Sequence, residues 1–125
     1  MIAVLTKRAD FLAANSGMRN ARAGFVLLTR PNDGQGIRFG ITVTKKIGNA
    51  VVRNRMKRRF RELLRAHLPE QGLPNHDHVL IGRASGVERD FHVMADELAR
   101  ALARARDGKG DPAGGRRPRK GNRRK

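Results

Sequence analysis

Basic side chains are concentrated in one short segment of the chain, from Lys45 to Arg65. This segment holds nine lysine and arginine residues and a single acid, Glu62. Six of the nine are arginines, whose planar guanidinium groups bind phosphate through paired hydrogen bonds and also stack on nucleobases. Such a local concentration of positive charge predicts a binding site for a polyanion.

A helical projection of residues 50–68 separates these charges from an apolar face. At about 100° per residue, the apolar side chains fall on one continuous arc that must pack against the rest of the domain. These apolar residues are Val52, Met56, Phe60, Leu63 and Leu64. The residues at every fourth position along the border of the arc, which we call the basic ridge, are Arg53, Lys57, Arg61 and Arg65. The polar residues further round the helix are Asn54, Arg55 and Arg58.

The basic ridge needs an explanation, because like charges at this helical spacing repel by roughly 0.2–0.5 kcal/mol per pair. An anionic ligand that neutralises the ridge supplies one. The alternative is that the long arginine stems cover the apolar border and that their charged ends are simply hydrated. We favour the anion-binding interpretation, since the overall charge of the chain and the local ridge agree.

The residues before this helix favour the same kind of ligand. Gly48 permits a close turn, and Asn49 can cap the helix. The free N–H groups of the first turn, together with Lys45 and Lys46, are suited to hold a phosphate. The same pattern is also that of an ordinary helix start.

The sequence offers no set of residues for hydrolytic chemistry of its own. Its eleven acidic residues are scattered, whereas a protein nuclease normally presents clustered carboxylates that hold metal ions. The stretch from His76 to His78 could bind a metal, but no third ligand is evident, so two loop residues before a strand are the better interpretation. We therefore expect neither catalytic nor metal-binding residues.

Length and composition predict one domain followed by a basic tail. The 125 residues carry a formal net charge of +17 and contain no cysteine, which excludes disulfides and thiolate metal sites. Residues 1–106 form the expected domain, and the glycine-rich residues 107–125 are expected to be disordered. This tail is either a solubilising or appended sequence or an arm that neutralises phosphates. The apolar runs are too short to cross a bilayer and no secretory signal is present, so we expect a cytoplasmic protein without a membrane partner.

The remaining pattern predicts an α+β domain in which a small sheet packs against helices. Periodicity predicts, in order, a helix over 7–15, strands over 23–30 and 37–44, a helix over 50–68, a strand over 78–83 and a helix over 89–106. Thr6 is the expected cap of the first helix, and Pro69 is the expected end of the long one. The turn residues from Pro31 to Gly34 predict that the first two strands pair as a hairpin.

The segment from Arg38 to Glu62, RFGITVTKKIGNAVVRNRMKRRFRE, closely resembles the signature of the protein subunit of bacterial ribonuclease P, including its Arg-Asn-Arg element. Looser similarity extends the resemblance to about residues 5–106. The enzyme of this family removes the 5′ leader of precursor tRNA by hydrolysing one phosphodiester bond. The resemblance implies that a large RNA subunit performs this chemistry with Mg²⁺. It further implies that the small protein binds this RNA, needs no protein partner, and holds the leader in a cleft between its first helix and the sheet.

The resemblance also implies a fold and individual roles. The implied order is α-β-β-β-α-β-α, with a left-handed βαβ crossover around the long helix, although right-handed crossovers are the strong general preference. The positions that match residues near the leader and the cleavage site are Arg53, Asn54, Lys57 and Arg61. The positions that match residues facing the RNA subunit are Arg55 and Arg58. The positions that match the cleft are Phe11, Val26 and Thr42. The full predicted RNA-binding set is Lys45, Lys46, Asn49, Arg53, Asn54, Arg55, Lys57, Arg58, Arg61 and Arg65.

Two positions depart from the family pattern. Asn15 and Leu28 stand where many relatives have aromatic residues, and stacking on a base contributes on the order of 1–3 kcal/mol. Leader contact in this chain is therefore expected to depend more on phosphates than on stacking. Two other functions stay open on the sequence alone: a small ribosomal protein or nucleic-acid chaperone, and, less favoured, a nuclease that acts without RNA.

Overall fold

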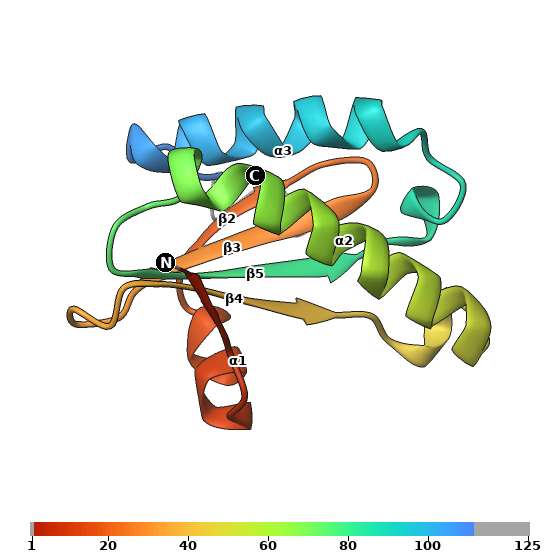
Figure 1. The fold of residues 1–125 in the computed structure, drawn as a ribbon, viewed down its shortest axis with the longest axis horizontal. Coiled ribbons are helices and arrows are strands. Elements are labelled where there is room, and N and C mark those ends of the chain that lie inside the picture. Colours follow the sequence, from red (N-terminus) through yellow and green to blue (C-terminus); the bar gives the residue numbers. More distant parts are fainter. Residues whose placement is uncertain (1, 112–125) are drawn as a thin grey trace, which may run out of the picture.

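A computed structural model describes residues 2–111 of the chain as a five-stranded mixed sheet with three α-helices (Figure 1). The elements follow one another as β1 (Ile2–Val4), α1 (Arg8–Ala14), β2 (Met18–Ala21), β3 (Phe25–Pro31), β4 (Ile37–Thr42), α2 (Ala50–Gln71), β5 (His76–Gly82) and α3 (Phe91–Arg106). Two short 3₁₀ turns are η1 (Lys45–Ile47) and η2 (Ala84–Gly86). The α+β class is thus confirmed. None of the helices in this described part is long and apolar enough to span a membrane.

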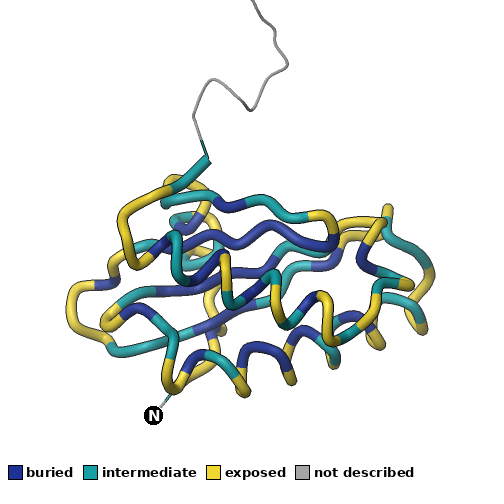
Figure 2. The backbone as a smooth tube through the Cα atoms, turned by 90° about the horizontal axis from the view of Figure 1, so that it is seen from above, coloured by how far each residue is buried: buried dark blue, intermediate teal, exposed yellow. Residues whose placement is uncertain are grey.

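The sheet separates two hydrophobic cores of unequal size. Helices α2 and α3 cover one face, where they enclose the large core around Phe25, Phe39 and Phe60. Helix α1 lies on the opposite face over a small core that includes Ala14 and Val79. Figure 2 shows the result, with buried central strands and helices that alternate between buried and exposed positions. The long amphipathic helix is therefore fixed by its apolar side, and its polar sides stay accessible.

The connection from β4 through α2 to β5 is left-handed. The two strands are parallel neighbours in the strand order β1-β4-β5-β3-β2. In Figure 1 both run to the right, β5 lies above β4, and α2 crosses in front of them. This arrangement is the rare hand for such a crossover, and it confirms what the family resemblance implies.

Strand pairing differs from the sequence prediction in two respects. The expected hairpin of β3 with β4 is wrong, because β5 lies between them and pairs with both. The strands β1 and β2 were not predicted from periodicity, since they have only three and four residues and β2 lacks an apolar alternation. Strand β2 supplies the third strand before α2 that the resemblance implies, and β1 adds an edge beside β4.

Helix ends also differ at two places. Helix α1 begins at Arg8 after Lys7, which makes no side-chain cap, so the expected Thr6 cap is wrong. Helix α2 continues past Pro69 to Gln71. A proline in the last turn removes only one N–H group, and the Gly72 N–H still donates to the Leu68 carbonyl at 2.9 Å. The expected cap of α2 is confirmed, since the Asn49 side chain accepts the N–H of Val52 at 3.0 Å.

The first residues of the predicted tail are bonded to the edge strand β2. The Asp111 N–H donates to the Arg19 carbonyl at 2.6 Å, and the Asp111 carboxylate accepts the Ala21 N–H at 2.7 Å. The buried Asn20 side chain donates to the Lys109 carbonyl at 3.3 Å and accepts from Arg104 at 3.0 Å. Residues 107–111 therefore extend the domain beyond the expected boundary at 106. The rest of the predicted tail, 112–125, lies outside the described residues.

Two truncated chains should show how much residues 107–111 contribute to stability, apart from the rest of the predicted tail. A chain that ends after Asp111 should unfold at the same temperature as the full chain. A chain that ends after Arg106 loses the bonds to β2 and should be less stable by about 1–3 kcal/mol, the range for a few part-buried hydrogen bonds. Thermal and urea unfolding of both chains measure this difference, and equal stability of the two would show that residues 107–111 contribute nothing to the fold.

Candidate nucleic-acid interface

Helix α2 presents the basic ridge and the remaining predicted residues to the outside of the domain. Its buried side chains are Met56, Phe60, Leu63, Leu64 and Leu68. The predicted RNA-binding residues that are exposed are Lys45, Lys46, Asn49, Asn54, Arg55, Arg58, Arg61 and Arg65, and those that are half-buried are Arg53 and Lys57. The first turns of α2 extend past the end of β4 (Figure 1), and Lys45 and Lys46 of η1 are both exposed.

The basic ridge is not neutralised from within the described residues. The ion pairs there involve only Arg38 and Arg89 as cations. Within the ridge, Arg53 donates from Nε to the Gly48 carbonyl at 3.1 Å, which keeps its positive charge available. The ridge therefore has the charge that an external anion would neutralise.

Arg59 has a different role from its neighbours in the basic segment. Its guanidinium donates to the carbonyls of Val87 and Arg89, at 3.3 Å and 2.5 Å, and lies 6.0 Å from the centroid of the Phe91 ring. These contacts join α2 to the turn that precedes α3. Arg59, which was not among the predicted RNA-binding residues, is thus a structural arginine.

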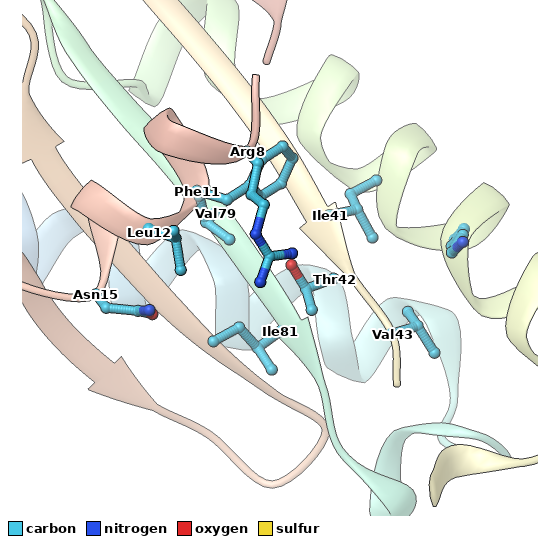
Figure 3. A pocket seen from close by; sticks show the side chains of 10 residues that line it. Arg8, Phe11, Leu12, Asn15, Ile41, Thr42, Val43, Val79 and Ile81 are labelled. Atoms are coloured by element: carbon cyan, nitrogen blue, oxygen red, sulfur yellow. The ribbon is translucent and has the colours of Figure 1, made fainter. Parts of the chain in front are cut away.

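A cleft of about 530 Å³ opens between α1, the sheet and α2. It is lined by Arg8, Phe11, Leu12, Asn15, Ile41, Thr42, Val43, Lys57, Val79 and Ile81. The close-up in Figure 3 shows side chains of α1 on one side and those of β4 and β5 on the other, with Arg8 extending from α1 toward Thr42. The floor is apolar and the rim carries cations, which is the combination that binds single-stranded nucleic acid through bases and phosphates.

The structure brings most of the predicted cleft residues together. Phe11 and Thr42 line the cleft, and Lys57 of the basic ridge reaches it from α2. Val26 lies on the same face of the sheet, but it is buried in the small core and does not line the cleft. Arg8 was missed by the sequence analysis. Phe11 and Asn15 follow Arg8 at i+3 and i+7, which places all three on one helix face. This spacing could have predicted that Arg8 lies beside the cleft.

A second groove of about 300 Å³ continues the cleft beyond the end of α1. The two share Asn15 and Ile81. The other residues that line the second groove are Gly17, Met18, Arg19, Leu28, Gly110 and Asp111. The two departures from the family pattern, Asn15 and Leu28, thus lie in the same groove, and none of its lining residues is aromatic. Arg19 provides the positive charge among the residues that line this groove.

His76, Asp77 and His78 all lie in β5, where Asp77 and His78 are buried and have structural roles. Burial alone raises the pKa of the Asp77 carboxyl, but hydrogen bonds from Arg38 and Asn32 outweigh it and hold that pKa below its ordinary value. The ring nitrogens of the buried His78 contact the Leu73 N–H and the Arg38 carbonyl. Among residues 2–111, no group of three His, Cys, Asp or Glu residues is arranged to hold a metal ion.

Comparison with known proteins identifies the family. A family model described as "Ribonuclease P" matches residues 2–106. The chain belongs to the ribonuclease P family. One relative, the "Ribonuclease P protein component" of Erythrobacter litoralis, is 73% identical over 110 residues, which is 88% of this chain and 91% of the relative. The protein of the same name from Ruegeria pomeroyi is 48% identical over 81% of this chain and 84% of its own length.

Solved structures of ribonuclease P proteins have the same fold. The protein from Staphylococcus aureus superposes with a TM-score of 0.70 at 31% identity, over 82% of this chain and 94% of its own. The protein from Thermotoga maritima superposes with a TM-score of 0.68 at 33% identity, over 80% and 94%. Membership of the ribonuclease P family makes this chain a protein component of an endoribonuclease complex in tRNA processing.

Proposed function

We propose that this chain is the RNA-binding protein subunit of a bacterial ribonuclease P, in the cytoplasm, and that it holds the 5′ leader of precursor tRNA. The observation that carries the proposal is the junction of the cleft and the basic ridge at Lys57. A single strand that lies in the cleft can place bases against Phe11 and Ile41 while its phosphates face Arg8 and Lys57. From there the strand can pass directly onto the outer ridge of α2.

The residues that line the cleft suit RNA but do not suit Mg²⁺. Magnesium prefers carboxylate and phosphate oxygens, whereas the described cleft is lined by cations, amides, a hydroxyl and apolar groups without any carboxylate. This composition supports a division of labour in which an RNA subunit holds the Mg²⁺ and hydrolyses the phosphodiester bond. The protein binds and orients the RNA, and its cations reduce the repulsion between phosphates. No other protein partner is needed for this role.

The two sides of α2 suit two different RNA contacts. The residues assigned to the leader are Arg53, Asn54, Lys57 and Arg61, of which Lys57 lines the cleft. Arg55 and Arg58 are exposed further round the helix and are assigned to the RNA subunit. Lys45, Lys46 and the capped first turn at Asn49 add N–H groups and positive charge, which suit a phosphate.

Reconstitution tests the proposal. The purified chain alone should leave precursor tRNA intact, and adding it to a bacterial ribonuclease P RNA at limiting Mg²⁺ should stimulate cleavage. The complex should also bind precursor tRNA more tightly than mature tRNA. A chain that stimulates nothing would refute the proposal. Equal affinity for the two tRNAs would favour a general nucleic-acid chaperone, and EDTA-sensitive cutting without RNA would favour a protein nuclease.

Substitutions on the two sides of α2 should have opposite patterns of effect. Lys57→Ala should weaken precursor-tRNA binding by about three- to tenfold and leave assembly with the RNA subunit nearly unchanged, because it removes one phosphate contact in the cleft. Arg55→Ala should weaken assembly by a similar factor and leave the preference for precursor over mature tRNA unchanged. Filter-binding titrations of both steps measure these factors.

Arg100→Ala on the outer face of α3 is the matched control for these two variants. It removes the same charge from a helix surface away from the cleft, and both affinities should stay within about twofold of the parent. If Lys57→Ala and Arg55→Ala affected both steps equally, the two-sided assignment would be wrong even though the chain binds RNA.

A further inference from the structure

Helix α1 is held in place by contacts with the sheet and not by its own stability. It has only seven residues, and Lys7 at its start makes no side-chain cap. Isolated helices of this length are not stable in water. Because α1 supplies one wall of the cleft, through Phe11 and Leu12, the shape of the cleft depends on whatever fixes α1 to the sheet.

One row of β4 side-chain positions faces α1. Residues two apart on a strand share a face, so Arg38, Gly40 and Thr42 form this row. Thr42 lines the cleft. At Gly40 the ring of Phe11 comes so close that an added Cβ atom would lie 2.5 Å from its Cε1 and 2.6 Å from its Cζ. Only glycine lets the aromatic ring rest on the strand at this position.

Arg38 joins the first turn of α1 to a buried carboxylate. Its Nε and Nη2 donate to the two oxygens of Asp77 at 2.7 Å and 2.8 Å, and its Nη2 lies 3.7 Å from Asp10 Oδ1 in α1. Asp77 is 2% exposed and also accepts from Asn32 at 2.9 Å. The guanidinium is therefore fixed on the sheet side by a rigid partner, and Asp10, 29% exposed, is attached to it from the helix side.

We infer that Arg38 and Gly40 are positioning residues for the leader cleft, acting through Asp10 and Phe11 respectively. Arg38 holds the start of α1 against β4. Gly40 leaves the space in which the Phe11 ring lies against the strand, beside Thr42. Neither residue contacts RNA in this assignment. The inference rests on the proposed function, because the cleft that the two residues shape is the one assigned to the leader.

Removing the charge of Asp10 should change RNA affinity in opposite directions for a positioning role and for a purely electrostatic role. Asp10 is an acid near a surface that is assigned to phosphates, so removing its charge should by charge alone strengthen RNA binding. If Asp10 positions α1, the same substitution weakens binding of the leader. Mature tRNA has no leader, so its affinity reports the charge effect alone.

The decisive experiment is Asp10→Asn in the complex reconstituted with a ribonuclease P RNA. The Kd for precursor tRNA should rise by about two- to fivefold, the equivalent of one part-exposed ion pair, and the Kd for mature tRNA should not rise. Asp10→Glu, which keeps the carboxylate, should stay closer to the parent. Asp96→Asn, which removes the same charge from α3 on the other face of the sheet, is the control and should not weaken either tRNA.

Gly40→Ala is the second variant. It should raise the Kd for precursor tRNA about tenfold, the loss of one base–aromatic stacking contact, while assembly with the RNA subunit stays unchanged. Amide hydrogen exchange of the free protein should show faster exchange in α1 for both variants. Tighter binding of both tRNAs by Asp10→Asn, or unchanged α1 exchange in both variants, would overturn the inference. A parent complex without leader preference would instead refute the proposed function, and the exchange data would still decide whether Arg38 and Gly40 hold α1.

Discussion

Replacing Asn15 by phenylalanine should strengthen the binding of precursor tRNA by about five- to a hundredfold. Asn15 is exposed at the end of α1 and lines both the cleft and the second groove. A base that stacks on an aromatic ring there gains on the order of 1–3 kcal/mol. The backbone of Asn15 is right-handed helical, with φ of −62° and ψ of −23°, so phenylalanine fits without strain. Equilibrium binding of precursor and mature tRNA to the reconstituted complex measures the gain.

Two controls make this result specific. Asn15→Leu adds apolar surface without an aromatic face and should gain much less. Ser16→Phe adds the same ring at the next residue, which lines neither the cleft nor the second groove, and should leave the affinity unchanged. An equal gain for mature tRNA would mean that the new ring binds some other part of the RNA, and no gain at all would mean that the leader does not pass Asn15.

The parts of the fold with a strong local pattern were predictable. The apolar arc of α2 repeats over several turns, and its burial and its polar sides follow from that repeat. The order of the strands in the sheet was not predictable in this way. The position of β5 between β3 and β4 involves the bonds of Asp77 to Arg38 and Asn32, residues about 40 positions away in sequence. No short-range pattern in the chain reports such contacts.

The candidate site was also predictable only where it depends on a local sequence pattern or on the family resemblance. The basic ridge was visible as charge at helical spacing, and Phe11 and Thr42 were named through the family resemblance. The end of the second groove could not be predicted, because Gly110 and Asp111 lie in a segment whose composition indicates disorder. Asp111 is held by a backbone bond from its N–H to the Arg19 carbonyl and by its carboxylate, which accepts the Ala21 N–H. Both bonds join residues about 90 positions apart in sequence, so no local pattern indicates them.

The stability of the domain should depend on pH through His78, a fully buried histidine of β5. Its Nε2 accepts the Leu73 N–H at 3.0 Å, and its Nδ1 lies 3.1 Å from the Arg38 carbonyl, so the neutral ring carries its proton on Nδ1. Burial lowers the pKa of His78 from 6.5 to about 4. A second proton on Nε2 would break the bond to Leu73 and place a positive charge in the core, and the attraction of Asp77 for this charge is smaller than the cost of burying it. His78 therefore binds a proton more weakly in the folded state than in the unfolded state.

Acidification should consequently reduce the free energy of unfolding by about 3 kcal/mol between pH 6.5 and pH 4. The contribution is complete above pH 6.5, where both states have a neutral ring, and it is lost as the unfolded state takes up a proton. Asp77, whose pKa is lowered, acts only at more acidic pH, so the two effects are separable. Urea unfolding at several pH values measures the slope. His78→Leu should remove most of this slope, although it lowers stability at neutral pH, whereas His92→Leu on the surface of α3 should retain it. An unchanged slope in His78→Leu would assign the acid sensitivity to other groups.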